Sequence, residues 1–145
     1  MASQLGADCA FFIRNKPVFA TGIGDVFTDV SVSLAGYHLV VVKPDIHIDT
    51  GQAYQGIVPC PEGGGLAAAI ALPVEAWKDR ITNDFEAGAF VRHPLIGQVK
   101  AQLYEAGALY AAMSGSGSAV FGIFDQAVRF GETFGGHQVF YIDSE

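Results

Sequence analysis

Residues 107–124 read GALYAAMSGSGSAVFGIF, in which two apolar runs flank a serine–glycine repeat. We expect ALYAAM and AVFGIF to be strands, because short apolar runs bounded by turn residues are typical of strands. The repeat between the two strands is then a loop. Its residues are Ser114, Gly115, Ser116, Gly117 and Ser118.

The Ser114–Ser118 loop has the composition of an anion-binding loop. Its alternating glycines let the backbone approach an anion closely, and successive N–H groups can form a nest to which serine hydroxyls add donors. A flexible hairpin loop is the alternative interpretation. The loop is not a Walker loop, because no Gly-Lys-Ser/Thr follows it, and not a dinucleotide fingerprint, because a strand follows it.

Outward from this hairpin, the preceding chain predicts one strand and several helices. Tyr37–Lys43 (YHLVVVK) is β-branched and bounded by glycine and proline, so we expect a buried strand. Thr50 is expected to N-cap a short helix that runs through Ile57. Val58–Gly65 is expected to be a loop, and Pro73–Arg80 is expected to be helical.

Two further helices are predicted before the hairpin. Asn83 and Glu86 resemble a capping box that opens the helix NDFEAGAF. Pro94 fits the first turn of the next helix and Gly107 fits its C′ position. The residues expected along one face of that helix are Ile96, Val99 and Leu103.

After the hairpin we expect a short helix near Gln126–Thr133 and a last strand, QVFYI. From Tyr37 onward the order is strand, helices, strand, strand, helix, strand, which is the ferredoxin-like split β-α-β pattern of an α+β fold. The residues before it read as the strands AFFI and VFAT around a turn at Arg14–Pro17. They are expected to be the edge of a neighbouring domain.

Composition excludes some classes of function. The 8 basic and 15 acidic residues give a formal charge of −7, with no Lys/Arg run, so a nucleic-acid partner is not expected. No apolar stretch is long enough to span a membrane, and no signal peptide is recognised, so we expect a cytoplasmic protein. Cys9 and Cys60 are expected to be unpaired.

A few side chains outside the loop are candidates for chemistry. Asp8 is either a turn or cap residue or a carboxylate able to orient or deprotonate a hydroxyl. Thr50 and Tyr54 lie four apart, hence on one helical face, as either an N-cap with a core aromatic or a hydroxyl with a ring that stacks on a base. The histidines show no metal-ligand spacing, so no metal site is predicted.

These segments together resemble the GHMP small-molecule kinases. The resemblance rests on LGADCAFF, the GIGD turn, LVVVKPDIHIDTGQAY, TNDFE and the stretch from HPLIG to AVFGIF, and it covers nearly the whole chain. GALYAAMSGSGSAVFGIF is similar to the third signature of these kinases. The form of this motif resembles that of the branch that phosphorylates a cytidine-diphosphate-linked methylerythritol for non-mevalonate isoprenoid biosynthesis.

The resemblance implies a fold, a reaction and roles for residues. Residues 35–145 would be the kinase C-terminal domain, and residues 1–34 would be the end of an N-terminal domain like ribosomal protein S5. ATP with Mg²⁺ would phosphorylate the C2 hydroxyl. The family's catalytic aspartate maps onto Asp8, its substrate-side threonine and aromatic onto Thr50 and Tyr54, and its phosphate-region loop onto Ser114–Ser118.

The same resemblance implies that part of the kinase is absent from these residues. The family's catalytic lysine and its ATP phosphate loop match no segment here, so we expect the 145-residue chain alone to be inactive. Self-association through apolar surface is also expected if the missing half normally covers that surface.

Two other interpretations stay open. The chain could belong to another GHMP kinase, of the homoserine, mevalonate or galactose type, although those relatives use different third motifs. It could also be a non-catalytic ferredoxin-like ligand-binding module, because the fold alone does not decide function.

Overall fold

The computed structural model describes residues 7–55, 57–58 and 65–144. The chain forms two compact units, Met1–Ser33 and Leu34–Glu145. The break lies one residue from the boundary predicted from the sequence. Within the described residues, no helix is both long and apolar enough to cross a membrane.

In its described part, from residue 7 on, the first unit contains helix α1 (Ala7–Arg14) and a hairpin of β1 (Val18–Thr21) and β2 (Val26–Asp29). The two strands pair antiparallel, with Phe19 opposite Thr28. The prediction of strand VFAT is confirmed. Its partner, however, is β2 rather than AFFI, and the turn falls at Gly22–Gly24.

The predicted strand AFFI is wrong, because these residues are helical in α1. The N–H of Asn15 donates to the carbonyl of Phe11 at 2.9 Å, and Asn15 has a φ of 46°. A left-handed Asn directly after the last turn, with Arg14 before it and Pro17 soon after, is a typical helix end. The residues interpreted as a hairpin turn therefore terminate a helix.

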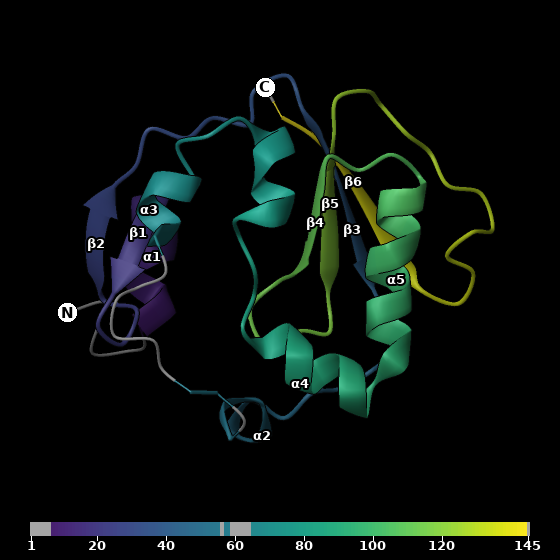
Figure 1. Ribbon diagram of the computed structural model, residues 1–145, viewed down its shortest axis with the longest axis horizontal. Coiled ribbons are helices and arrows are strands. Elements are labelled where there is room, and N and C mark those ends of the chain that lie inside the picture. Colours follow the sequence, from purple (N-terminus) through teal and green to yellow (C-terminus); the bar gives the residue numbers. More distant parts are fainter. Residues whose placement is uncertain (1–6, 56, 59–64, 145) are drawn as a thin grey trace. The chain divides into compact units, whose positions relative to one another are not determined.

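The second unit is built on a four-stranded antiparallel sheet with the order β4-β5-β3-β6 (Figure 1). Its strands are β3 (His38–Lys43), β4 (Tyr110–Met113), β5 (Val120–Phe124) and β6 (Gln138–Asp143). Its helices are α2 (Thr50–Tyr54), α3 (Leu66–Ala69), η3 (Val74–Asp79, a 3₁₀ helix), α4 (Phe85–Arg92) and α5 (Pro94–Glu105). This strand order is that of the ferredoxin-like fold, which confirms the predicted fold class.

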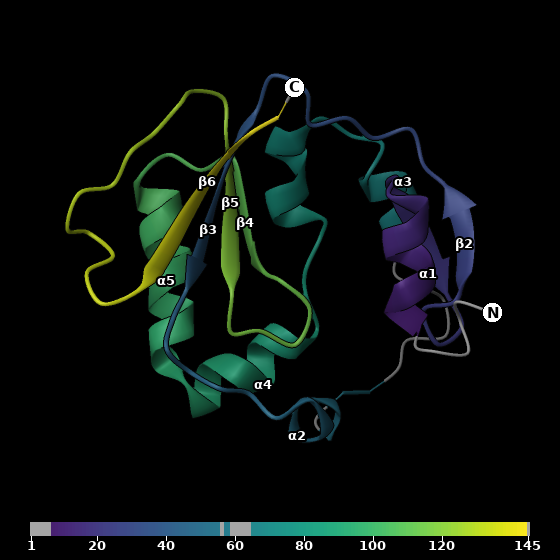
Figure 2. The ribbon, with the colours of Figure 1, turned by 180° about the vertical axis from the view of Figure 1, so that it is seen from behind.

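Helix α5 covers one face of the sheet, as Figures 1 and 2 show from opposite sides. Its buried residues are the three predicted ones, Ile96, Val99 and Leu103. They meet Val40, Val42, Ala111, Val120 and Phe124 in the main hydrophobic core. Burial of each such aliphatic side chain contributes about 1.5–3 kcal/mol.

The end of α5 matches its sequence signal. Gly107 has a φ of +97°, its N–H donates to the carbonyl of Tyr104, and the N–H of Ala108 donates to Leu103. This is the double hydrogen bond of a Schellman motif, which satisfies carbonyls that the last turn leaves free. The motif turns the chain directly into β4.

The opposite face of the sheet is covered over β4 by η3. Side chains alternate along a strand, so Tyr110 points away from its neighbour Ala111, which lies in the core under α5. Trp77 of η3 packs edge-on against Tyr110 at 5.7 Å between ring centroids. The indole N–H of Trp77 donates to the carbonyl of Leu72 at 2.8 Å, so its polar atom is satisfied.

Four local predictions are corrected. Asp49, not Thr50, caps α2 by accepting from the N–H of Gln52, and α2 ends at Tyr54 rather than Ile57. Residues 126–133 are not helical, because Phe130 packs into the core and both its N–H and its carbonyl bond the hydroxyl of Tyr141. The fourth correction, the role of Glu86, belongs to the site described below.

Two predictions fall wholly or mostly on residues that the structure leaves undescribed. Most of the predicted loop Val58–Gly65 lies outside the described residues, as does Cys60. Cys9, by contrast, is exposed and unpaired, as expected.

Candidate functional site

The serine–glycine loop closes the hairpin between β4 and β5. Met113 pairs with Val120, and the N–H of Ser114 donates to the carbonyl of Ala119 at 2.8 Å. The N–H of Gly117 turns back onto the carbonyl of Ser114 at 3.0 Å. Gly115 and Gly117 have φ angles of 55° and 88°, a left-handed conformation in which glycine carries no Cβ penalty. The predicted strand–loop–strand arrangement is therefore confirmed.

The donors of this loop divide between inside and outside. Ser118 is 2% exposed, and its hydroxyl lies 2.6 Å from the carbonyl of Ile46 and 3.3 Å from that of Pro44. Ser114 is exposed. Within the described residues, the N–H groups of Gly115 and Ser116 make no hydrogen bond. Ser118 therefore anchors the loop to the segment after β3, while the N–H groups of Gly115 and Ser116 have no partner among the described residues.

A second anchor comes from Asn83, just before α4. Its side-chain amide donates to the carbonyl of Met113 at 2.7 Å and to that of Gly115 at 2.8 Å. Its side-chain oxygen accepts from the N–H of Phe85 at 2.9 Å. Asp84 occupies the N-cap position of α4 and makes no side-chain cap, so Asn83, the predicted cap, lies one residue before the observed cap position. Asn83 nevertheless supplies the acceptor at the start of the helix and also holds the loop.

Glu86 does not close the predicted capping box. It is 7% exposed, and one carboxylate oxygen accepts from the N–H of Met113 at 2.8 Å. The other oxygen lies 2.6 Å from the ammonium of Lys100 on α5. A buried carboxylate requires such partners, so Glu86 faces the sheet instead of the helix terminus. It fixes the last residue of β4, directly before the loop.

Tyr110, at the start of β4, has a perturbed acidity. Burial, with smaller contributions from Tyr104 and Glu86, raises the pKa of Tyr110 to about 12. Its hydroxyl donates to the carbonyl of Ile81 at 3.3 Å. Tyr110 therefore stays neutral near pH 7 and serves to pack β4 rather than to exchange protons.

Helix α2 presents the other two predicted site residues of the second unit. Tyr54 is 61% exposed and packs edge-on against Phe85, with ring centroids 4.9 Å apart. Thr50 is exposed and is not the cap of its helix. Neither purely structural interpretation, a core aromatic or an N-cap, therefore accounts for these residues. The exposed part of the Tyr54 ring is free to stack on a flat group.

Contacts bring the two parts of the site together. Asn83 binds the loop and the N–H of Phe85, and the ring of Phe85 packs edge-on against that of Tyr54. The segment before α2 binds Ser118 through Ile46. The predicted residues Thr50, Tyr54 and Ser114–Ser118 thus lie at one end of the sheet. One connection runs through Asn83 and Phe85, and the other runs through Ile46.

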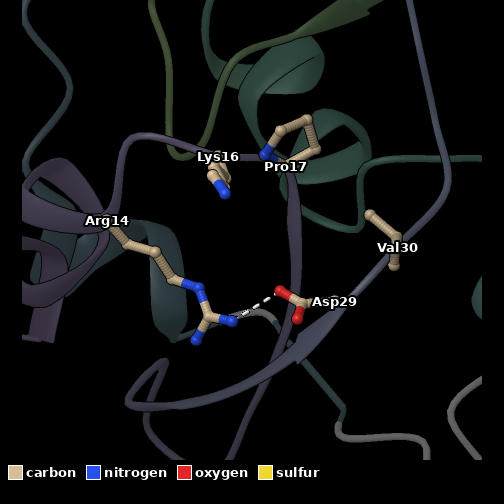
Figure 3. Close-up of a pocket in the computed structure, with 5 residues that line it drawn as sticks. All are labelled: Arg14, Lys16, Pro17, Asp29 and Val30. Atoms are coloured by element: carbon tan, nitrogen blue, oxygen red, sulfur yellow. Dashed lines mark hydrogen bonds and ion pairs between the residues drawn. The ribbon is translucent and has the colours of Figure 1, made fainter.

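The remaining predicted residue, Asp8, belongs to helix α1 of the first unit. The convergence of Asp8 with the serine–glycine loop stays a prediction. The same unit has a surface cavity of about 430 Å³ lined by Arg14, Lys16, Pro17, Asp29 and Val30 (Figure 3). Arg14 is paired with Asp29 there, so its charge is already neutralised.

Asn83, Glu86 and Lys100 were not predicted as site residues. The sequence did contain a signal, because TNDFE was one of the segments that carried the resemblance. Local capping rules offered a sufficient explanation for Asn83 and Glu86, and they obscured the long-range partners. Among the described residues, no group of three or more His, Cys, Asp or Glu side chains gathers into a metal site.

Comparison with known proteins identifies the domain. The family described as GHMP kinases C terminal matches residues 66–132. The 4-diphosphocytidyl-2-C-methyl-D-erythritol kinase of Parabacteroides distasonis is 54% identical over 132 residues, which cover 91% of this chain and 49% of the relative. The kinase of the same name from Bacteroides thetaiotaomicron is 48% identical over 139 residues, 96% of this chain and 51% of the relative.

Solved structures agree with this assignment. A crystal structure of 4-(cytidine 5'-diphospho)-2C-methyl-D-erythritol kinase matches with a TM-score of 0.66 and 26% identity, over 83% of this chain and 45% of that one. Homoserine kinase from Cytophaga hutchinsonii, 18% identical with a TM-score of 0.60 over 82% of this chain and 45% of its own, shares the fold. The chain spans about half the length of the curated relatives it matches. It therefore carries the C-terminal domain of the GHMP kinases and matches the C-terminal half of those named 4-diphosphocytidyl-2-C-methyl-D-erythritol kinase.

Proposed function

We propose that this chain forms half of a kinase that transfers the γ-phosphoryl group of ATP to the C2 hydroxyl of 4-diphosphocytidyl-2-C-methyl-D-erythritol. The observation that carries the proposal is the joining of the serine–glycine loop to α2 through Asn83 and Phe85. One end of a single sheet thereby holds both an exposed aromatic ring and backbone N–H groups that have no partner among the described residues. Such donors suit the phosphates of a nucleotide derivative, and such a ring suits its base.

Each predicted residue has a role in this reaction. Tyr54 stacks on the cytosine ring of the acceptor, and Thr50 adds a hydroxyl on the same face of α2. The N–H groups of Gly115 and Ser116 border the transferred phosphate. Asp8 orients the C2 hydroxyl and accepts its proton as the hydroxyl oxygen bonds to the γ-phosphorus. The bond from that phosphorus to the bridging oxygen breaks, and ADP leaves.

Positioning contributes more to this reaction than basicity. An ordinary aspartate has a pKa of about 3.9, so it is a weak base at neutral pH. Phosphoryl transfer depends mainly on alignment and on charge stabilisation. Mg²⁺ enters with ATP as part of the substrate, and no step is assigned to a metal held by the described residues of this chain.

The direct test is a chimera in which these 145 residues replace the matching half of the Parabacteroides distasonis kinase. Purified chimera is given ATP with the cytidine-linked methylerythritol, homoserine or mevalonate, and the product is followed by ³¹P NMR. We expect a new phosphate monoester only with the first acceptor. Phosphorylation of homoserine or mevalonate instead would overturn the substrate assignment.

Two controls make the test decisive. Asp8→Asn in the chimera should lower kcat by at least about 100-fold, the usual contribution of a positioned base. A polypeptide of residues 1–145 alone should not turn over ATP, because the family's phosphate loop and catalytic lysine match no segment in it. Turnover by the isolated chain near the rate of the chimera would contradict this expectation.

A cytoplasmic location is part of the same proposal.

A further inference from the structure

Asn83 makes more hydrogen bonds than a helix cap requires. A capping side chain needs one acceptor for one backbone N–H, which the Asn83 oxygen provides to Phe85 at 2.9 Å. Its amide nitrogen reaches 30 residues further, to the carbonyl of Met113 at 2.7 Å, and 32 residues further, to that of Gly115 at 2.8 Å. Capping explains only one of these three bonds.

The orientation of this amide follows from its partners. If the oxygen and nitrogen exchanged places, an oxygen would face two carbonyl oxygens and an NH₂ group would face an N–H. All three contacts would then become repulsive. The side chain can therefore satisfy the loop and the helix only in the observed orientation, and only as a primary amide.

The two carbonyls held by Asn83 belong to the residues that lead into the loop. Gly115 is exposed, with a φ of 55°, and a Cβ at this position would meet nothing within 4 Å. No side-chain packing therefore determines how its peptide groups are turned. The hydrogen bond from Asn83 engages the Gly115 carbonyl oxygen, which would otherwise be available to repel an anion.

The donor side of the same segment is open. The N–H groups of Gly115 and Ser116 have no partner among the described residues, whereas those of Ser114 and Gly117 are used within the hairpin. Ser118 holds the far end of the loop through its buried hydroxyl. Asn83 is thus the side chain that binds the Gly115 carbonyl, next to the N–H groups without a partner among the described residues.

We propose that Asn83 is a positioning residue for phosphate binding. It fixes the Gly115 carbonyl against α4 so that the N–H groups of Gly115 and Ser116 stay available to the polyphosphate of a nucleotide. The inference rests on the proposed function for the identity of the nucleotide. The anion-binding role of the loop is testable separately.

The main experiment uses Asn83→Asp in the active chimera. Asp has the same size and keeps an acceptor for the N–H of Phe85, but it places a carboxylate oxygen against the carbonyls of Met113 and Gly115. We expect KM for ATP to rise at least tenfold, while KM for the acceptor changes less than twofold. Asn83→Ala, which adds no charge, should raise KM for ATP in the same direction.

Thr82→Asp is the matched control. It adds the same negative charge one residue earlier, at an exposed position, and leaves the three bonds of Asn83 intact. We expect KM for ATP to change less than threefold in this variant. An equal effect of Thr82→Asp and Asn83→Asp would show that charge alone is responsible, and would overturn the proposal.

A second measurement does not depend on kinase activity. Inorganic tripolyphosphate is added to the ¹⁵N-labelled 145-residue chain, and amide resonances are followed. We expect the Gly115 and Ser116 signals to shift in the wild type and in Thr82→Asp, but not in Asn83→Asp. Shifts that persist unchanged in Asn83→Asp would refute the positioning role. If the chimera is inactive towards the methylerythritol but these shifts depend on Asn83, the substrate assignment fails and the positioning role stands.

Discussion

Substituting each loop glycine by alanine separates backbone conformation from packing. Gly117 has a φ of +88°, and a Cβ there would lie 2.6 Å from the sulfur of Met113 and 3.0 Å from Cδ1 of Ile48. Both neighbours are buried, at 2% and 9% exposure. Gly115 has a φ of +55°, and its Cβ would meet nothing within 4 Å. Gly115→Ala is therefore a matched control for Gly117→Ala.

The expected magnitudes follow from these geometries. A left-handed alanine costs about 1–2 kcal/mol at either position, and the stiffer unfolded chain returns about 0.4–1 kcal/mol. Gly117→Ala adds overpacking of about 1–3 kcal/mol, because Met113 and Ile48 must move within a closed core. With the middle of each range, Gly115→Ala should thus cost about 1 kcal/mol and Gly117→Ala about 3 kcal/mol.

Thermal and urea unfolding of the 145-residue chain, followed by circular dichroism, measure these costs. One kcal/mol corresponds to about 3 °C in Tm for a chain of this length. We therefore expect Gly117→Ala to lower Tm by about 6–12 °C and Gly115→Ala by less than about 4 °C. Equal losses in the two variants would refute the packing argument. A further check is Met113→Ala, which should destabilise the Gly117→Ala protein less than the wild type, because it relieves the overlap.

Three further predictions concern the surroundings of the loop. Lys100→Met should lower the free energy of unfolding by about 3 kcal/mol in urea titrations, because Glu86 is left as a buried, uncompensated carboxylate; a loss below about 1 kcal/mol would contradict this. Because burial raises the pKa of Tyr110 to about 12, the unfolded chain releases this proton at lower pH than the folded chain. The free energy of unfolding should therefore fall as pH rises from about 10 to 12, and it should fall less in Tyr110→Phe. Equal slopes of this free energy against pH in the two proteins would contradict the prediction. Tyr54→Ala should weaken binding of cytidine diphosphate to the active chimera about 5- to 100-fold with little change in Tm, while Tyr54→Phe retains binding; unchanged affinity in the alanine variant would exclude stacking.

Elements with strong local signals were predictable from the sequence. The β-branched run of β3, the proline start and glycine end of α5, and the hairpin of β4 and β5 all occur as expected. In each, the local preference agrees with the burial that the tertiary structure provides. Ile96, Val99 and Leu103 lie on one helical face and are also the residues under which the sheet packs. Where local preference and tertiary burial agree in this way, the secondary structure of a segment can be predicted from its sequence.

Short apolar runs were less predictable. AFFI is too short to show whether its period is that of a strand or a helix. The deciding information lay after it, where Asn15 takes the left-handed conformation that ends α1. The predicted helix at 126–133 failed for a different reason. Tyr141, from the last strand, holds Phe130 by both its N–H and its carbonyl, and no local rule anticipates a partner 11 residues away.

The candidate site was predictable in its parts but not in its connections. Composition alone indicated that residues 114–118 form a loop with free donors, but not what holds them. Buried backbone groups at the end of β4 need partners, and the partners are side chains of Asn83 and Glu86, 27 to 32 residues earlier. A buried N–H without an acceptor costs about 1–3 kcal/mol. Glu86 therefore satisfies Met113 and Lys100 in place of the helix terminus. The segment that begins α4 thus binds the loop through Asn83 and the strand before it through Glu86.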